Sequence, residues 1–423
     1  MKAALSADNF SNVFAECRFC SARLKQSFVD LGMSPLCQTQ IAPEHLNEME
    51  PFFPLHVWVC NECLLVQLQE YVAPDVIFGA DYPYYSSYSD SWVEHARQYV
   101  AHMMLDHGIG ADAFVVEIAS NDGYLLQHFV ERKVRCLGVE PTKGTADAAL
   151  AKGIPTVVRF FGDETAADLR ATHGAAQLIL GNNVLAHVPD LNDFVAGVKT
   201  LLADGGITTF EFPHLVKLME LNQFDTIYHE HFSYFSFSTV RRIFAAHGLR
   251  LFDVRELGTH GGSIRIYGCH DDDDTHPDHE RAAALLRRER EAGYQDIAAY
   301  LDFSAKVTKV KRSLLQFLIA AKGEGKRIVG YGAPGKGNTL LNYCGIREDF
   351  LDYTVDRNPH KQGTYTPGTR IPIHDPSKIF ETKPDFVLIL PWNLTPEITK
   401  TMAGIREWGG KFVVPIPDVR VID

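Results

Sequence analysis

The stretch that decides the fold reads Phe114-Val115-Val116-Glu117-Ile118-Ala119-Ser120-Asn121-Asp122-Gly123, and a second apolar run, Val134 to Glu140, follows it. Each run has the composition of a buried parallel strand. A tight turn and a helix are expected between the two strands. The second strand ends in the carboxylate of Glu140, 23 residues after Glu117. Strand, turn, helix and acid-ended strand together predict a nucleotide-binding α/β sheet in which the acid binds ribose hydroxyls.

The turn lacks the Gly-x-Gly-x-x-Gly pattern that lets a backbone approach a pyrophosphate closely. A cofactor with an adenosine ribose and no phosphate fits better, and S-adenosylmethionine is the obvious one. Further strands are expected at 177–180 and 207–212, and a late hairpin turns at Gly261-Gly262. This succession resembles the seven-stranded Rossmann-like sheet of a class I methyltransferase. Asn182 and His187 follow the 177–180 strand, where they either line the cofactor pocket or belong to a helix-capping loop.

Four of the eight cysteines form two Cys-x-x-Cys pairs, Cys17 with Cys20 and Cys60 with Cys63. Two such pairs can hold one metal ion in a tetrahedral set of four thiolates. Because protein would fill every position of that site, we expect a structural Zn²⁺ that stabilises a domain too small for a sufficient core. The alternative is two unconnected pairs of thiols.

The residues 228–236 read Tyr-His-Glu-His-Phe-Ser-Tyr-Phe-Ser, which concentrates imidazoles, a carboxylate and phenols in nine positions. Ser233 stands where the second histidine of a zinc-protease motif would have to be. A histidine can take a proton, and a tyrosine hydroxyl can donate to a developing oxyanion, so the block predicts acid–base chemistry. The alternative is an aromatic, hydrogen-bonded core loop. The segment 81–92 is also rich in tyrosine and serine and predicts either a ligand-contacting wall or the packed start of a helix.

A second glycine-rich turn follows a strand at 327–329 and reads Gly330-Tyr331-Gly332-Ala333-Pro334-Gly335-Lys336-Gly337-Asn338, with a helix expected from Thr339. The turn partly matches a dinucleotide fingerprint and partly a P-loop, and Asp356 ends the next strand. Pro334 and Lys336 disfavour the first match, and Gly337 replaces the Mg²⁺-binding hydroxyl of the second. Both interpretations share an anion site made of backbone N–H groups, a helix N-terminus and one lysine. A substrate diphosphate is a reasonable occupant.

Length and composition frame these motifs. The chain has 423 residues, 41 basic and 53 acidic, and its net charge of −12 argues against broad nucleic-acid binding or a polybasic membrane anchor. No apolar run suggests a membrane-spanning helix and the start does not read as a signal peptide, so a cytoplasmic protein is expected. We expect three domains: a zinc-binding domain at 1–75, a methyltransferase domain at 76–270 and a Rossmann-like domain at 280–423, with an Asp-rich linker before the last.

Taken in order, the zinc cysteines, Glu-Ile-Ala-Ser-Asn-Asp-Gly, Tyr-His-Glu-His-Phe-Ser-Tyr and Gly-Tyr-Gly-Ala-Pro-Gly-Lys-Gly-Asn closely resemble the three-domain sugar C-methyltransferases of bacterial deoxysugar biosynthesis. The resemblance covers nearly the whole chain. It implies an α/β protein with a zinc-binding N-terminal domain, a central S-adenosylmethionine domain and a C-terminal Rossmann-like domain that binds the sugar nucleotide. It also implies methylation at C3 of a nucleotide-linked 4-ketosugar, usually a dTDP sugar. No obligate protein partner is evident.

The resemblance further implies roles for individual residues. His231 corresponds to the general base, and Tyr228, His229 and Glu230 would orient the sugar or stabilise the enolate. Tyr82 or Tyr84 would contribute a further phenol, with Tyr82 grouped among the catalytic residues and Tyr84 among those that bind substrate. The remaining roles are cofactor binding by Glu117, Ser120, Asn121, Gly123, Glu140, Asn182 and His187, and substrate binding by Lys336, Asn338 and Asp356.

Two other functions remain open on the sequence alone. An NAD-dependent sugar-nucleotide oxidoreductase would use the Gly330 turn, but it leaves residues 117–123 unexplained. A non-catalytic zinc-ribbon protein with degenerate Rossmann domains is the second alternative, and the intact acid–base block at 228–234 argues against it.

Overall fold

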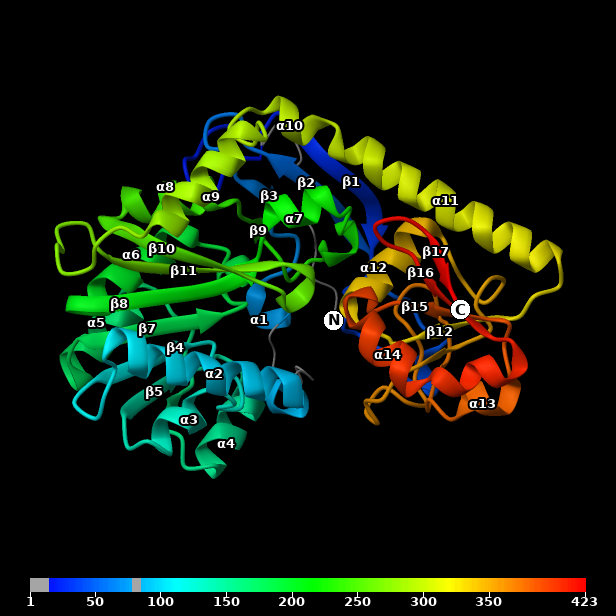
Figure 1. Ribbon diagram of the computed structural model, residues 1–423, viewed down its shortest axis with the longest axis horizontal. Coiled ribbons are helices and arrows are strands. Elements are labelled where there is room, and N and C mark those ends of the chain that lie inside the picture. The colour runs from blue at the N-terminus through cyan, green and yellow to red at the C-terminus, as the bar shows by residue number, and fades with distance from the viewer. Residues whose placement is uncertain (1–14, 78–84) are drawn as a thin grey trace.

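The computed structural model describes residues 15–77 and 85–423. Tyr82 and Tyr84 therefore lie outside the described residues. Three β-sheets organise the described chain, and Figure 1 shows the two larger ones in separate lobes with the smallest sheet above and between them. The fold is α/β, as the sequence predicts. None of the helices in the described ranges is long and apolar enough to cross a membrane.

The smallest sheet belongs mainly to the cysteine-rich region. Its strand order is β1-β2-β3-β9 and every pairing is antiparallel. Three of its strands come from the N-terminal region, β1 (Gln26–Ser34), β2 (Phe53–Val59) and β3 (Val66–Leu68). The fourth, β9 (Ser233–Tyr234), is part of the predicted acid–base block. The block is thus physically attached to the zinc-binding region. Two short helices, η2 (Pro43–His45) and α1 (Pro74–Ile77), complete this part.

The central sheet has seven strands in the order β10-β11-β8-β7-β4-β5-β6. Only β11 runs antiparallel to its neighbours; the other strands share one direction. A reversed strand inserted beside the last parallel one is the arrangement expected of a class I methyltransferase sheet. The strands are β4 (Phe114–Ile118), β5 (Arg135–Val139), β6 (Thr156–Val157), β7 (Ala176–Asn182), β8 (Leu202–Pro213), β10 (Leu249–Leu257) and β11 (Ser263–His270).

Helices cover both faces of this sheet because alternate strand residues point to opposite sides. Val115 packs with one group of helices and Val116 with the other. The first group is α2 (Asp90–His107), α3 (Leu126–Val130) and α4 (Lys143–Ala151). The second group is α5 (Asp163–His173), α6 (Leu191–Leu201) and α8 (Phe237–Ala246). Shorter helices lie in the connections: η3 (Ser86–Tyr88), η4 (Leu185–His187), α7 (Leu215–Glu220), η5 (Phe224–Thr226) and η6 (Thr259–Gly261).

The C-terminal sheet has six strands in the order β14-β13-β12-β15-β16-β17, all parallel except β17. The strands are β12 (Ile328–Tyr331), β13 (Thr354–Val355), β14 (Ile373–His374), β15 (Phe386–Ile389), β16 (Lys411–Val414) and β17 (Arg420–Ile422). Its helices and the helices that lead into it are α9 (Glu280–Glu291), α10 (Ala298–Leu301), α11 (Phe303–Gly323), α12 (Gly335–Cys344), α13 (Lys378–Thr382), η7 (Trp392–Leu394), α14 (Thr395–Thr401) and η8 (Ala403–Trp408).

Helix α12 begins four residues earlier than the sequence predicts. Pro334, at φ −77°, is its N-cap, and Gly335, Lys336 and Gly337 are already helical. Packing overrides the poor helix propensity of these glycines. The consequence is that Lys336 projects from the first turn of the helix rather than from the preceding loop.

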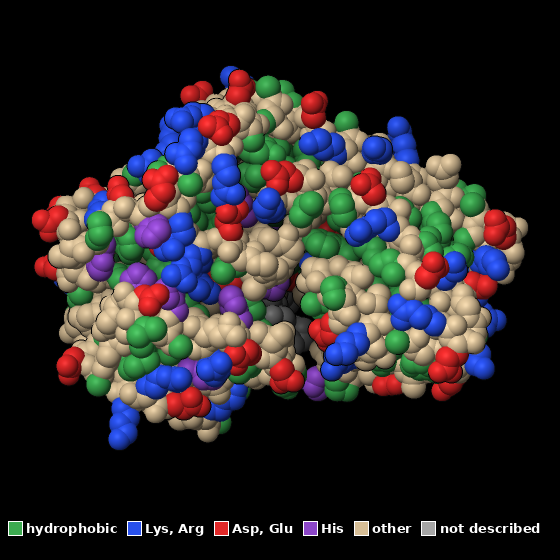
Figure 2. Space-filling view, in the orientation of Figure 1, with side chains coloured by type: hydrophobic (Ala, Val, Ile, Leu, Met, Phe, Trp, Pro, Cys, Tyr) green, Lys and Arg blue, Asp and Glu red, His purple; other side chains and the backbone are tan. Residues whose placement is uncertain are grey.

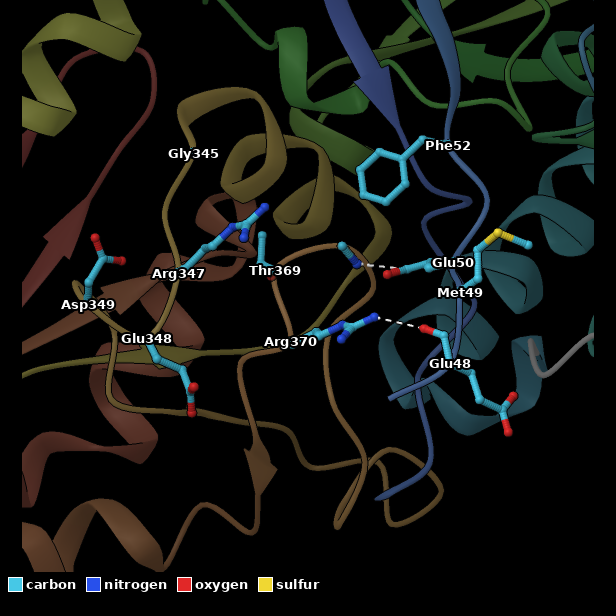
Figure 3. Close-up of a pocket in the computed structure, with 11 residues that line it drawn as sticks. Glu48, Met49, Glu50, Phe52, Gly345, Arg347, Glu348, Asp349, Thr369 and Arg370 are labelled. Atoms are coloured by element: carbon cyan, nitrogen blue, oxygen red, sulfur yellow. Dashed lines mark hydrogen bonds between the residues drawn. The ribbon is translucent and has the colours of Figure 1, made fainter. Parts of the chain in front are cut away.

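One apolar core joins the small sheet to the C-terminal lobe. It contains residues of β1, β2 and β3 together with residues of α11 and α12, and the rings of Phe28 and Phe303 stack with their centroids 4.5 Å apart. At the edge of this contact lies a groove of about 630 Å³ (Figure 3). There Gly368 N donates to Glu50 Oε1 at 2.8 Å and Arg370 donates to the backbone oxygen of Glu48. None of the predicted site residues that the structure describes lines this groove.

Candidate active site and zinc site

The four cysteines of the two pairs come together as predicted. Their Sγ atoms all lie within 4.8 Å of one another. Cys17 Sγ is 3.5 Å from Cys63 Sγ, and Cys20 Sγ is 3.6 Å from Cys60 Sγ. A tetrahedron with Zn–S bonds of about 2.3 Å has edges of about 3.8 Å, whereas a disulfide needs about 2.05 Å. The spacing therefore fits four thiolates on one zinc ion and not two disulfides.

The predicted cofactor residues meet at the carboxyl edge of the parallel strands β4, β5 and β7. Glu140, at the end of β5, accepts hydrogen bonds from Asn121 N and Thr142 N, both at 2.8 Å. The turn after β4 uses left-handed backbone at Asn121 (φ 52°) and Gly123 (φ 77°). A side chain at Gly123 would also place its Cβ 2.2 Å from Ile154 Cδ1. Glycine is required here by both the conformation and the space.

Glu117, at the same edge, carries a buried carboxyl group that suits a cationic ligand. Its side chain is buried, and neither carboxylate oxygen has a hydrogen-bond partner among the described residues. Burial, and then the nearby Glu140 and Asp122, raise the pKa of Glu117 well above its usual range. Ser120 Oγ is buried and equally unpartnered within the described chain. A buried carboxyl group without a cation suits a ligand that brings positive charge, and S-adenosylmethionine carries an ammonium and a sulfonium.

Two contacts close this end of the site. Asn182 Nδ2, at the end of β7, donates to the Tyr124 hydroxyl at 3.3 Å. Ser86 N donates to Asn121 Oδ1 at 2.8 Å, so the described part of the tyrosine- and serine-rich segment packs against the cofactor turn. The same segment also supplies the start of a helix, because Ser89 caps α2 by accepting from Trp92 N, so its contact with a ligand stays a prediction.

His231 is held in one orientation by the backbone that precedes it. Its Nδ1 lies 2.8 Å from the carbonyl oxygen of Thr226, which belongs to η5. Because a carbonyl only accepts, Nδ1 carries the proton and Nε2 keeps its lone pair. Burial, and then the neighbouring His187, hold the pKa of His231 well below its usual range. The imidazole is therefore neutral at neutral pH and has a proton-accepting nitrogen.

Aromatic rings surround this imidazole. The rings of Tyr228 and His231 have centroids 4.1 Å apart, and those of His187 and His231 are 4.7 Å apart. Burial lowers the pKa of His187 to about 4. Tyr228 and His187 are both partly accessible, so the two side chains reach the open side of the cluster. The structure thus brings three of the predicted site residues together.

The two residues between Tyr228 and His231 face the zinc-binding region instead. His229 Nε2 is 3.2 Å from the backbone oxygen of Pro54, in β2. The Cys37 thiol donates to Glu230 Oε1 across 3.6 Å. His229 therefore anchors the block to the small sheet, and the structure gives it no place beside the His231 imidazole. Glu230 connects the block to the loop that carries Cys37.

Lys336 reaches the site from the C-terminal lobe. Its Nζ donates to Asn393 Oδ1 at 2.9 Å and lies 4.6 Å from the centroid of the Trp392 ring. Trp392 Nε1 in turn donates to Asp225 Oδ2 at 2.7 Å. Burial raises the pKa of Asp225 to about 6, and burial lowers the pKa of Lys336. A desolvated ammonium with a single hydrogen bond is suited to an anionic ligand.

The other two predicted substrate-binding residues make contacts within the protein. Asn338 is buried and its Nδ2 donates to the backbone oxygen of Cys37 at 2.6 Å. Asp356 Oδ2 accepts from Ala333 N at 2.8 Å. A Cβ at Gly335 would lie 3.0 Å from Cys37 Sγ. The glycine-rich turn thus packs against other protein atoms, and the predicted anion site depends on Lys336 rather than on a backbone cradle.

Figure 2 shows a furrow between the two lobes on this face of the molecule, with some of the histidine side chains of this face beside it. The sequence interpretation assigned no site role to several residues beside the site, namely Cys37, Asp225, His260 and Trp392. The sequence offered a signal for one of these residues, His260, because the predicted turn at Gly261-Gly262 adjoins it. The others depend on contacts between segments far apart in the chain.

Comparison with known proteins agrees with these three parts. Family profiles match a zinc binding domain at residues 17–78, a methyltransferase domain at 92–254 and a C-methyltransferase C-terminal domain at 258–417. The chain is also 37% identical over 410 residues to the C-methyltransferase NovU of Streptomyces niveus, covering 96% of each chain. The chain belongs to the C-methyltransferase family. A C-methyltransferase of this family uses S-adenosylmethionine, so the oxidoreductase and the non-catalytic alternatives are both wrong.

Two solved methyltransferase structures resemble part of this C-methyltransferase. The magnesium protoporphyrin IX methyltransferase of Synechocystis, with bound S-adenosylmethionine, is 13% identical and gives a TM-score of 0.32 over 42% of this chain and 78% of that one. The CcbJ methyltransferase of Streptomyces caelestis is 12% identical, with a TM-score of 0.33 over 42% of this chain and 89% of that one. These scores are too low to add to the assignment, which rests on the sequence relative and the family profiles.

Proposed function

We propose that this C-methyltransferase methylates C3 of a nucleotide-linked 4-keto deoxysugar, with a dTDP sugar as the expected form and His231 as the general base. The orientation of His231 is the observation that carries the proposal. The Thr226 carbonyl fixes the proton on Nδ1, which leaves Nε2 as the nitrogen that can accept a proton. Methyl transfer to oxygen or nitrogen would not require a base beside a carbon, whereas transfer to carbon does.

The chemistry follows from the acidity of a carbon beside a ketone. Nε2 of His231 removes that proton, and the negative charge moves to the ketone oxygen as an enolate. The Tyr228 phenol, whose ring lies 4.1 Å from that of His231, is placed to donate to that oxygen. Once methyl transfer is complete, the imidazolium returns its proton to solvent. S-adenosylmethionine, when bound, supplies the electrophilic methyl group that the substrate carbon takes.

In this proposal the cofactor is bound by the central sheet and the substrate diphosphate by the C-terminal lobe. Glu117, Ser120, Asn121 and Glu140 would hold the cofactor at the strand ends, where unpartnered polar atoms lie. The buried ammonium of Lys336 would face the diphosphate from the C-terminal lobe. The proposal includes three functional units divided near residue 75 and between 270 and 280, a cytoplasmic location and a small-molecule substrate as the main partner.

The test is incubation with isotopically labelled S-adenosylmethionine and a panel of sugar nucleotides, read by mass spectrometry. The panel should include 4-keto and 4-hydroxy forms of the same sugar on dTDP and UDP. We expect label only in the 4-keto forms. Label in a 4-hydroxy form, or in none of them, would contradict the proposed substrate class.

A further inference from the structure

The turn between β10 and β11 places a histidine in an unusual backbone conformation. His260 has φ 53° and ψ 20°, in the left-handed region, and it is followed by Gly261 at φ 91° and Gly262 at φ 121°. Non-glycine residues rarely adopt this conformation, because it brings the Cβ atom close to the backbone. Such strain persists only where the surroundings fix it, and it is concentrated at functional sites.

The surroundings of this turn do fix it. Thr259 Oγ1 donates to Glu211 Oε1 at 2.9 Å, and Gln223 Nε2 donates to the backbone oxygen of Gly261 at 2.7 Å. From the C-terminal lobe, Trp392 packs so closely that a Cβ at Gly261 would lie 2.5 Å from its Cη2 atom. The direction of the His260 side chain is therefore set by both lobes.

The imidazole of His260 is engaged at one nitrogen only. Asn183 Nδ2 is 3.1 Å from His260 Nε2, which as the acceptor leaves the proton on Nδ1. The ring packs against the edge of Trp92 at 5.1 Å and is partly accessible. No hydrogen bond of its Nδ1 is found within residues 15–77 and 85–423. Burial, and then Lys336, lower the pKa of His260 to about 4, so the ring is neutral at neutral pH.

Printed contacts connect the turn of His260 with the proposed base: Trp392 packs against Gly261 and donates to Asp225, and the carbonyl of the next residue, Thr226, holds His231. The positive charge of Lys336 lowers the pKa of both His231 and His260, and His260 in turn lowers the pKa of His231. The geometry agrees with this: Trp392 packs against Gly261, the neighbour of His260, and Lys336 Nζ lies 4.6 Å from the centroid of the same Trp392 ring. The ring N–H of His260 and the ammonium of Lys336 are two hydrogen-bond donors suited to a negatively charged oxygen.

We propose that His260 binds the substrate, with its ring N–H donating to an anionic oxygen of the sugar nucleotide beside Lys336. The inference rests on the proposed function, because it needs a substrate that carries or develops negative charge next to His231. Two oxygens of that substrate have the required chemistry: the enolate oxygen formed by deprotonation and the diphosphate. The donor is the same in both cases, and kinetics distinguish the two.

The test uses the full-length enzyme and two substitutions at this position. His260→Gly removes the side chain without straining the left-handed backbone. His260→Asn also tolerates that backbone and keeps an N–H donor close to the position of Nδ1. We expect His260→Gly to lower kcat/KM by about 10- to 100-fold, the usual effect of losing a hydrogen bond to a charged group. We expect His260→Asn to recover part of that loss, with the affinity for S-adenosylmethionine unchanged in both.

The kinetic parameters show which oxygen is bound. Loss in kcat, with slower exchange of the substrate C–H in D₂O, indicates the enolate oxygen. A raised KM, with weaker inhibition by the free nucleoside diphosphate, indicates the diphosphate. The exposed His45→Asn serves as a matched control and should change neither parameter.

Three results would overturn the inference. A kcat/KM within twofold of wild type for His260→Gly shows that the side chain does not touch substrate. Equal losses in His260→Gly and His260→Asn show that the ring acts only through packing. If the wild-type enzyme is inactive on every 4-ketosugar nucleotide, the proposed function itself fails and this inference falls with it. An active wild type with an active His260→Gly refutes the inference alone.

Discussion

Replacing Glu117 by glutamine tests the assignment of the cofactor end of the site. Glu117→Gln keeps the size of the side chain and removes the titratable group. In the wild-type protein both carboxylate oxygens are buried without partners in the described chain, and burial raises the pKa of this carboxyl well above its usual range. The substitution should therefore affect stability and cofactor binding in opposite directions.

The size of the stability effect follows from proton linkage. A folded-state pKa above the unfolded value of about 4.3 gives a contribution that is fully present below that value and is lost as the pH rises. One proton changes the free energy of unfolding by about 1.4 kcal/mol per pH unit over this window. In a domain of this size that corresponds to about 3–5 °C in Tm per pH unit. The Tm of Glu117→Gln should rise relative to wild type as the pH increases above about 5, by up to this amount per unit until the pH passes the folded-state pKa of Glu117.

The assay is thermal unfolding of the cofactor-free protein between pH 5 and 8, followed by calorimetric titration with S-adenosylmethionine. We expect the variant to bind the cofactor about 10- to 100-fold more weakly, because a carboxylate no longer meets its positive charge. Glu131→Gln is the matched control, since the Glu131 side chain is 62% exposed. A Tm difference that does not change with pH, or unchanged cofactor affinity, would refute the reasoning about Glu117.

Three further predictions concern the base, the metal and the contact between the lobes. His231→Asn keeps an N–H for the Thr226 carbonyl but has no Nε2, so kcat should fall by about 10²- to 10⁴-fold with cofactor affinity unchanged; near wild-type turnover would contradict the base assignment. Cys63→Ser should lower the zinc content measured by atomic emission and the Tm together, and a full zinc content would contradict the four-thiolate site. Gly261→Ala places a Cβ 2.5 Å from Trp392 at a φ of 91°, so it should lower the Tm by several degrees and make the junction between the lobes more sensitive to protease; wild-type resistance would refute the close packing.

Local patterns in the sequence were sufficient for the central sheet. The apolar runs at β4 and β5 and the turn between them depend on neighbours within 30 residues, and the structure confirms the predicted seven-stranded sheet with its reversed strand. The two cysteine pairs were equally informative, because the chemistry of thiolates and zinc imposes their convergence. Both predictions relied on short-range or strongly constrained chemistry.

The acid–base block shows where sequence reasoning stops. His229 and His231 are two positions apart, yet one contacts the carbonyl of Pro54 in the small sheet and the other the carbonyl of Thr226. The difference arises because Ser233–Tyr234 pairs with β3 of the N-terminal region, a contact that local spacing does not contain. The same holds for Cys37, which lies against Glu230 although 193 residues separate them.

The glycine-rich turn of the C-terminal lobe illustrates a second limit. Its glycines predict a phosphate close to the backbone. In the structure, other protein atoms occupy the space beside these glycines instead. Gly332 lies against Pro391 and Gly335 against Cys37, where a Cβ would be 2.5 Å and 3.0 Å away respectively. A glycine pattern indicates that a ligand or another part of the protein lies close to the backbone, but it does not distinguish between the two.

The central claim is that a carbon is deprotonated and then methylated. The most direct measurement uses a 4-keto sugar nucleotide carrying deuterium at C3, incubated with S-adenosylmethionine and the wild-type enzyme, with the product analysed by mass spectrometry and NMR. We predict a product that has gained a methyl group on C3 and has lost the deuterium to solvent. A methylated product that retains the deuterium, with its new methyl group on oxygen, would contradict the account.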